Sequence, residues 1–250
     1  MKKTALITGA TSGIGRATAK EFAKHGIKVI LCGRRQNRLN SVKKQLERET
    51  DVHTLNFDVR NKKDVFDAIN SLPEEFKQID ILINNAGNAH GLDPIQNGSI
   101  EDWDAMMDIN VKGLLYVSKA IIPKMTKRES GHIINIGSSA GKEVYPKGNV
   151  YCASKHAVIA ITDGMRIDLN PFGIKVTAIN PGLVETEFSK VRFKGEEIAG
   201  SVYKGYKALQ AEDIAEIIYF VISRPKHVNI ADLLVFPTAQ ANSTTVKKEF

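Results

Sequence analysis

The sequence predicts an α/β protein: a single Rossmann-type domain in which about seven parallel strands form a doubly wound sheet with helices on both faces. Short β-branched runs alternate with longer amphipathic stretches, and each run is too apolar to leave one face in water. A glycine-rich turn follows the first run directly. The 250 residues contain no long linker, low-complexity stretch or fixed-period repeat, so we expect one domain over 1–250.

The first two elements are a strand and a helix joined by the glycine turn. The apolar run at 4–8 is followed by Gly9, Gly13 and Gly15, and a helical apolar pattern then continues to Ala23. Glycines let a backbone approach a pyrophosphate closely, and the first-turn N–H groups and the helix dipole hold its negative charge. The turn therefore predicts a dinucleotide site, although its G-x-x-x-G-x-G spacing matches the common G-x-G-x-x-G fingerprint only loosely.

Six further strands are expected, at 27–32, 52–57, 79–84, 131–137, 173–180 and 231–236. Ligands of such sheets bind beyond the carboxyl ends of the strands, where the strand order reverses. The residues that fall at those ends are Gly9, Asp58, Gly87, Ser138 and Pro181-Gly182. The segment at about 185–208 interrupts the alternation because it is charged and punctuated by glycines. We interpret it as a substrate lid, with a plain surface insertion as the alternative.

A serine, a tyrosine and a lysine between 138 and 155 have spacings that suit proton transfer. Tyr151 and Lys155 are four residues apart, so they share one face of a helix, and Ser138 precedes the tyrosine by thirteen residues. A free tyrosine has a pKa of about 10, and a nearby ammonium lowers that pKa toward the working range. The Ser138 hydroxyl would hydrogen-bond the oxygen on which charge develops. The alternatives are a strand-end cap for Ser138 and a surface charge for Lys155.

The second strand ends at Cys32-Gly33-Arg34-Arg35, which bears on the choice of cofactor. An acidic residue there would hold the ribose hydroxyls of NAD and repel a 2′-phosphate. Two guanidinium groups instead favour a phosphate, through charge and bidentate hydrogen bonds. We therefore predict NADP(H), bound by Arg34 and Arg35; the alternative is that both arginines only begin a basic helix.

Six motifs occur in the order that is typical of one enzyme family. They are TGATSGIG at 8–15, NNAG at 84–87, DINV at 108–111, NIGS at 135–138, Tyr151 with Lys155, and Pro181-Gly182. Over essentially its whole length the sequence resembles the short-chain dehydrogenase/reductase family. With the residues above, the resemblance implies cofactor contacts from Gly9, Thr11, Ser12, Gly13, Ile14, Gly15, Arg34, Arg35, Asp58, Val59, Asn85, Ala86, Gly87, Tyr151, Lys155, Pro181, Gly182, Val184 and Thr186.

The resemblance also implies a mechanism, in which hydride moves between nicotinamide and substrate while Tyr151 gives or takes the proton. Lys155 would lower the tyrosine pKa and bind the nicotinamide ribose. Asn110 would position a water that links Lys155 to solvent, or alternatively would only kink a helix. Asp58 and Val59 would flank the adenine. The segment 181–186 would close over the nicotinamide, with Val184 and Thr186 the candidates for meeting its carboxamide.

Stretches before Tyr151, after Pro181 and near Phe236 resemble a narrower group, the NADP-dependent 3-hydroxy acid dehydrogenases that act on serine, other 3-hydroxy acids or the matching semialdehydes. Such a substrate needs a cation for its carboxylate, and Arg192 in the lid is our candidate, unless it is only a solvated arginine. Two other functions stay open. A 3-oxoacyl carrier-protein reductase or broad carbonyl reductase would use the same catalytic residues on thioesters or ketones. A non-catalytic NADP-binding sensor or interaction protein would not need the tyrosine and lysine.

Bulk properties narrow the partners. The net charge is +7, but basic residues are dispersed among acids without a stripe, so we expect a small hydroxy acid or carbonyl substrate and no nucleic acid. No apolar run approaches the roughly 18 residues of a membrane span, and a strand that begins at Thr4 leaves no room for a secretory signal, so we expect the cytoplasm. Cys32 and Cys152 are expected to be reduced packing thiols, and no metal site is expected. The family resemblance implies a homotetramer formed by helices at roughly 101–125 and 150–169.

Overall fold

The computed structural model describes residues 2–193, 195 and 201–249 and contains a seven-stranded parallel sheet. The strand order is β3-β2-β1-β4-β5-β6-β9, so the order reverses between β1 and β4. The strands are β1 (Thr4–Thr8), β2 (Lys28–Gly33), β3 (Val52–Asn56), β4 (Ile81–Asn84), β5 (His132–Ile136), β6 (Lys175–Pro181) and β9 (Asp232–Val235). Each lies within two residues of its predicted range, and the predicted fold class is confirmed.

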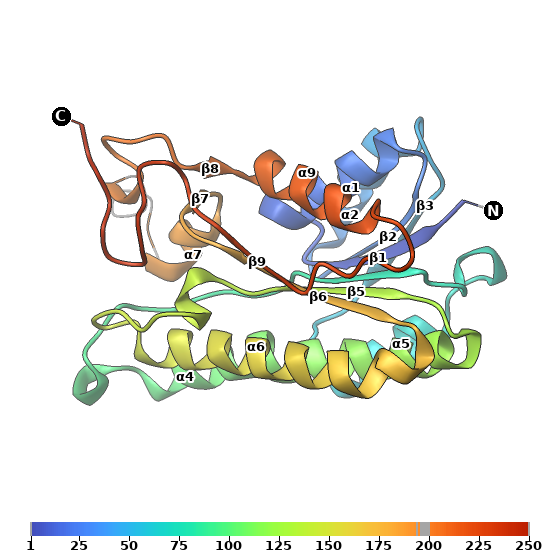
Figure 1. Ribbon diagram of the computed structural model, residues 1–250, viewed down its shortest axis with the longest axis horizontal. Helices are drawn as coiled ribbons and strands as arrows, with labels where there is room; N and C mark the ends of the chain where they lie inside the picture. Colours follow the sequence, from blue (N-terminus) through green and yellow to red (C-terminus); the bar gives the residue numbers. More distant parts are fainter. Residues whose placement is uncertain (1, 194, 196–200, 250) are drawn as a thin grey trace.

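Helices cover both faces of the sheet (Figure 1). One layer holds α1, α2 and α9, which pack on one hydrophobic core with the sheet, and the other layer holds α3, α5 and α6 on a second core. The helices are α1 (Gly13–Lys24), α2 (Gln36–Leu46), α3 (Lys62–Asn70), α4 (Ile100–Met107), α5 (Leu114–Arg128), α6 (Asn149–Leu169), α7 (Phe188–Phe193) and α9 (Ala211–Ile222). With both faces covered, the five central strands are largely buried, as their continuous apolar runs predict, whereas the edge strands β3 and β9 are partly exposed.

The helix predicted at roughly 101–125 is interrupted by a π-helical turn. Asp108–Gly113 forms this turn between α4 and α5. A π-helical turn widens the backbone ladder, and such turns are frequent at functional sites. Asn110 lies in the middle of it and is 2% exposed.

The segment after β6 leaves the main sheet. A two-stranded parallel ribbon of β7 (Val184–Glu185) and β8 (Leu209–Gln210) brackets the predicted lid, and α7 lies inside it. Lys194 and residues 196–200 of that lid lie outside the described residues.

Two other expectations concern membrane-spanning helices and the cysteines. Within the described part of the chain, no helix is both long and apolar enough to cross a membrane. Cys32 and Cys152 are free and buried, as expected of packing thiols.

Candidate functional site

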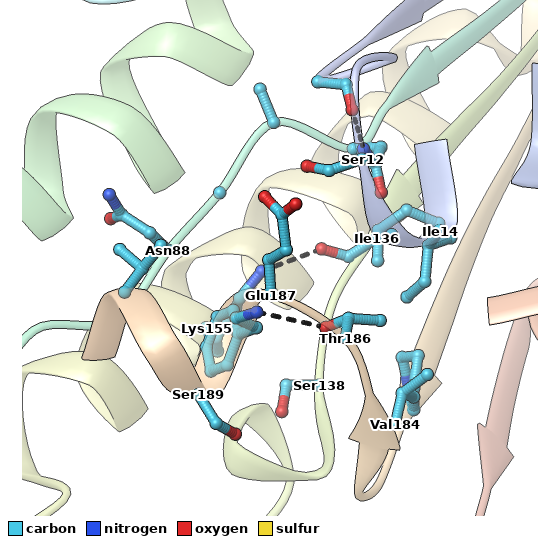
Figure 2. A pocket seen from close by; sticks show the side chains of 18 of the residues that line it. Ser12, Ile14, Asn88, Ile136, Ser138, Lys155, Val184, Thr186, Glu187 and Ser189 are labelled. Atoms are coloured by element: carbon cyan, nitrogen blue, oxygen red, sulfur yellow. Dashed lines mark hydrogen bonds between the residues drawn. The ribbon is translucent and has the colours of Figure 1, made fainter. Parts of the chain in front are cut away.

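A cavity of about 470 Å³ opens along the carboxyl edge of the sheet, where β1 and β4 reverse the strand order. Figure 2 shows side chains converging on it from the turn after β1, the end of β5, helix α6 and the segment after β6. Its volume is in the range of cofactor and ligand pockets. The predicted residues that line it are Gly9, Thr11, Ser12, Gly13, Ile14, Arg34, Arg35, Val59, Asn85, Ala86, Gly87, Ser138, Tyr151, Lys155, Pro181, Gly182, Val184 and Thr186.

The glycine turn is shaped for close backbone approach. Gly9 has φ of +66°, a left-handed conformation that favours glycine. Gly15 does not line the cavity, but a Cβ there would lie 2.5 Å from the carbonyl oxygen of Gly9, so it permits the turn to close. Asn85 holds the turn to β4, because its side-chain nitrogen donates to the carbonyl of Thr8 at 2.9 Å.

The N-terminus of α1 has the features of an anion site. Ser12, at the N-cap, makes no side-chain capping hydrogen bond, and no acidic residue lies in the first turn. The first N–H groups therefore lack a side-chain carboxylate as partner, and the helix dipole favours negative charge at this point. The residues present fit a dinucleotide pyrophosphate.

Arg35 lies beside this helix end, and Arg34 lies further out. One terminal nitrogen of Arg35 donates to Thr11 Oγ1 at 2.9 Å and to Ser12 Oγ at 3.2 Å. Arg34 contacts the Asp58 carboxylate at 3.4 Å. The described residues at the carboxyl end of β2 include no carboxylate that would contact a ribose 2′-hydroxyl, so this end of the cavity fits a 2′-phosphate.

Asp58 does not line the cavity, in contrast to Phe57 and Val59 on either side of it. Its carboxylate accepts from the Arg60 side chain at 2.7 to 3.1 Å. Burial raises the Asp58 pKa, but the hydrogen bonds from Arg60 and the charge of Arg34 outweigh it, so the pKa is below its ordinary value. In this structure the carboxylate serves the two arginines, and its predicted contact with adenine stays a prediction.

Ser138, Tyr151 and Lys155 converge at the other end of the cavity. Ser138 follows β5 and accepts the N–H of Ala140 at 3.1 Å, so it does cap the short helix Ser139–Gly141, yet it also faces the cavity. Tyr151 and Lys155 lie on one face of α6 and are 8% and 6% exposed. The Lys155 ammonium donates to the carbonyl of Ile136 at 2.9 Å (Figure 2), which excludes the surface-charge interpretation.

Burial dominates the protonation of this group. It raises the pKa of the Tyr151 phenol above its ordinary value, with help from Tyr145, while a hydrogen bond from Ser138 and the charge of Arg192 act the other way. Burial also lowers the pKa of Lys155 to about 8. The Lys155 ammonium is held at the carbonyl of Ile136 in the protein alone. In the protein alone, the expected lowering of the Tyr151 pKa is therefore not observed, and the phenol is protonated at neutral pH.

Asn110 lies behind the cavity wall. Its carboxamide oxygen accepts the N–H of Asn88 at 2.9 Å, and its nitrogen donates to the carbonyl of Asn88 at 2.8 Å and to Ser154 Oγ at 3.0 Å. A Cβ on Gly87 would lie 3.0 Å from that oxygen and 3.5 Å from the Lys155 ammonium. Asn110 thus both occupies the π-helical turn and ties α6 to the strand end next to the lysine.

Helix α7 brings Arg192 to the tyrosine. Its guanidinium carbon lies 5.4 Å from the centre of the Tyr151 ring, and one terminal nitrogen donates to the hydroxyl of Tyr145 at 2.8 Å. Arg192 and Gly91 exchange two hydrogen bonds, of 3.0 and 3.1 Å, which fix α7 on the loop after β4. Arg192 borders a small recess that it shares with Tyr151, and it does not line the main cavity.

Several lining residues were not predicted as site residues. The polar ones among them include Asn88, Tyr145, Glu187, Gln240 and Ser243. Tyr145 and Glu187 lie in the stretches before Tyr151 and after Pro181 that resemble the narrower dehydrogenase group. Their closeness in sequence to predicted site residues could have identified them. Gln240 and Ser243 had none, because the position of a chain end depends only on tertiary contacts.

The comparisons with known proteins agree with this geometry. A family model described as short chain dehydrogenase matches residues 3–197. An NADP-dependent 3-hydroxy acid dehydrogenase from Salmonella typhi is 46% identical over 94% of this chain and 95% of its own length. Sulfoacetaldehyde reductase 2 from Chromohalobacter salexigens is 44% identical, with 96% of each chain covered. The closed form of a serine dehydrogenase complexed with NADP+ superposes with a TM-score of 0.92 at 43% identity, covering 99% of this chain and all of that one.

Proposed function

Since the chain belongs to the short-chain dehydrogenase family, we propose that it is an NADP(H)-dependent oxidoreductase that interconverts a small 3-hydroxy acid, of the serine or 3-hydroxyisobutyrate type, and the matching carbonyl acid. One observation carries the substrate assignment. The Arg192 guanidinium lies 5.4 Å from the ring of Tyr151, so a cation is present beside the phenol. A carboxylate bound there would bring the carbinol carbon, which one carbon separates from the carboxylate, close to the tyrosine hydroxyl.

In the proposed mechanism, different side chains transfer the proton and stabilise the charge that develops on the substrate oxygen. When bound, the nicotinamide supplies or accepts the hydride. During carbonyl reduction, Tyr151 donates its proton to the carbonyl oxygen, and the Ser138 hydroxyl donates a hydrogen bond to the same oxygen. During oxidation, the phenolate takes the proton from the substrate hydroxyl. The Lys155 ammonium would bind the ribose of the cofactor, and its charge favours the phenolate. Asn110 would position the water through which the proton is replaced from solvent.

NADP(H) is proposed over NAD(H) on two grounds. Arg34 and Arg35 occupy the end of β2 where an acidic residue would repel a 2′-phosphate, and Arg35 already contacts the hydroxyls at the N-terminus of α1. Two of the three relatives above act with NADP or bind it, as their names state. The residues that would hold the cofactor are those that line the cavity, from the glycine turn to Val184 and Thr186.

The test is the absorbance change of NADPH with L-serine, D-serine, 3-hydroxyisobutyrate, 3-hydroxypropionate, 2-hydroxyethanesulfonate and a neutral secondary alcohol as substrates. We expect turnover of the acids and little of the alcohol. Arg192→Ala should raise KM for the acids by about 10-fold or more, because a charge-assisted hydrogen bond is lost, and should leave KM for the alcohol nearly unchanged. Equal effects on acids and alcohol would remove Arg192 from the site.

The same panel separates the other functions. A preference for 2-hydroxyethanesulfonate would favour a sulfonate substrate, which one relative supports by its name. Turnover of acyl thioesters or neutral ketones without turnover of acids would indicate a carrier-protein or broad carbonyl reductase. NADPH binding without any turnover would indicate a non-catalytic sensor.

We further propose that residues 185–208 act as a lid, that the protein works in the cytoplasm and that it assembles as a homotetramer. Exposed apolar side chains support the assembly: Ile100 on α4 is 65% exposed, Leu115 on α5 is 40% and Ile167 on α6 is 72%. Apolar residues on neighbouring helices are suited to a subunit interface. Light scattering should give a mass near four times 27.5 kDa, and a monomer mass would contradict the proposal.

A further inference from the structure

The end of the chain folds into a small hairpin against the cavity. Gln240 and Val246 form an antiparallel bridge, and the Asn242 carboxamide oxygen accepts the backbone N–H groups of Thr244 and Thr245, at 2.9 and 2.8 Å. We call residues 239–247 the C-terminal hairpin. These side-chain bonds from Asn242 fix the turn at the tip of the hairpin.

Three loops around the cavity hold the C-terminal hairpin and the residues that follow it. Gln240 Oε1 accepts the N–H of Leu183, in the loop after β6, at 2.8 Å. The N–H of Ser243 donates to the Glu143 carboxylate at 2.9 Å, just beyond the short helix that Ser138 caps. The N–H of Glu249 donates to the carbonyl of Gly205, near the end of the lid, at 2.7 Å. These loops carry the predicted nicotinamide, catalytic and lid residues.

Gln240 is packed too tightly to be a surface residue. It is 5% exposed, and a Cβ on Gly182 would lie 2.3 Å from its Oε1. Its side-chain nitrogen donates to the carbonyl of Asn242 at 3.0 Å, so the hairpin itself orients the carboxamide. The Leu183 N–H therefore has its direction set by the C-terminal hairpin, one residue before Val184.

Ser243 lies in the cavity wall, and its hydroxyl makes no hydrogen bond within the described part of the chain. Its Oγ is buried. A buried polar group without a partner costs free energy, so native proteins satisfy it with water or a ligand. The backbone bond ties Ser243 to Glu143, two residues beyond the short helix that Ser138 caps.

We propose that the C-terminal hairpin is part of the substrate site: Ser243 hydrogen-bonds the small acid substrate, and Gln240 is a positioning residue for the loop that closes on the nicotinamide. This rests on the proposed function, since it assigns further residues to the same reaction. It also gives the chain end a role that its sequence did not reveal.

Ser243→Ala tests the substrate contact, with Thr245→Ala as the matched control, because Thr245 is exposed on the same hairpin. Loss of one neutral hydrogen bond should raise KM for the hydroxy acid by about 3- to 10-fold, with the dissociation constant of NADPH, measured by fluorescence titration, within about twofold of wild type. Thr245→Ala should match wild type. Ser243→Ala that behaves like Thr245→Ala would overturn the contact.

Gln240→Leu and Gln240→Glu test the positioning role. Both keep the size of the side chain, but only glutamate keeps an oxygen for the Leu183 N–H. Amide hydrogen exchange at Leu183 should be faster in Gln240→Leu by about 10-fold, while Gln240→Glu should retain most of the protection, and kcat should follow the same order. Equal exchange in wild type and Gln240→Leu would overturn the role, whatever the activity.

The wild-type protein separates this failure from failure of the proposed function. If the wild-type protein turns over acids and the variants behave like wild type, only the hairpin proposal is contradicted. If it turns over another carbonyl class and Ser243→Ala raises KM for that class, the hairpin stands and the acid assignment falls.

Discussion

Tyr151 must be both buried and able to exchange a proton. Burial raises the pKa of its phenol, which keeps it protonated at neutral pH and suits proton donation to a carbonyl oxygen. Oxidation requires the phenolate, and a rising pH supplies more of it. Lys155 favours the phenolate only while it is charged, and its pKa of about 8 means that this help is lost above that pH. At neutral pH the protein alone therefore has the protonated phenol that carbonyl reduction requires.

Replacing Tyr151 by phenylalanine removes the proton donor and keeps the ring contacts with Phe188, whose ring centre lies 5.7 Å away. We expect kcat for carbonyl reduction to fall by about 10²- to 10⁴-fold, the usual contribution of a positioned acid. NADPH titration and thermal melting should show that the variant binds cofactor and folds. Near-normal turnover would mean that another group donates the proton.

The two arginines after β2 are expected to differ in importance. Arg35 contacts Thr11 and Ser12 at the helix N-terminus, whereas Arg34 lies against Asp58. Alanine at either position should lower kcat/KM for NADPH by about 10-fold or more, and Arg35→Ala by the larger factor, because a charge-assisted bond to phosphate is lost. The value for NADH should change little. Arg48→Ala removes an exposed charge just beyond α2 and serves as control; an equal loss in it would indicate only a general charge effect.

At the scale of elements, the sequence was sufficient wherever local pattern decides the structure. The strands of a parallel sheet have short apolar runs, so all seven strands could be predicted from the sequence, and Gly9 indicated the first turn. The π-helical turn at Asn110 could not be read, since its residues fit an ordinary helix and the extra width comes from packing against Asn88 and Ser154. The C-terminal hairpin could not be predicted either, because its position depends on contacts with residues far away in the sequence.

The segment between β7 and α7 lines the cavity and contacts both the glycine turn and helix α2. Thr186 packs on the glycine turn, 3.3 Å from where a Cβ on Gly13 would lie. The next residue, Glu187, meets Arg38 of α2 at 2.8 and 2.9 Å and Arg35 at 3.5 Å, and in Figure 2 its carboxylate points toward the side that carries Ser12. A cofactor bound beneath this bridge would leave only after the bridge opens.

Glu187→Gln should therefore speed NADPH release, by about 2- to 5-fold for exposed ion pairs and by less at high salt. Stopped-flow displacement of NADPH measures the rate. In a double-mutant cycle with Arg38→Gln, the combined variant should release NADPH no faster than the faster single variant. Multiplied effects of the two changes would show that the residues act separately, and the bridge would not govern release.

At the scale of the whole molecule, one buried histidine links the sheet to pH. His132 begins β5, is 4% exposed and lies 2.9 Å from Thr177 Oγ1 on β6. That hydroxyl donates to the carbonyl of Ile230 at 2.7 Å, so the histidine Nε2 must be the donor to Thr177. Nδ1 then carries the lone pair, and it has no partner within the described residues. Neutral His132 is thus built into the centre of the fold.

Protonation of His132 should destabilise the protein at a higher pH than protonation of the protein's carboxylates does. Burial and the charges of Lys175 and Lys3 lower the pKa of His132 to about 3, against about 6.5 in the unfolded chain. Below the unfolded value the unfolded chain binds more protons, so the free energy of unfolding should fall by up to about 1.4 kcal/mol for each pH unit between these two values. Urea unfolding from pH 7 to 5 measures this slope, before carboxylates titrate at about 4. In His132→Gln, the slope of the free energy of unfolding against pH should be smaller by the contribution of one proton. His227→Gln, at an exposed histidine, should keep the wild-type slope. Equal slopes in the two variants would show that another group causes the pH dependence.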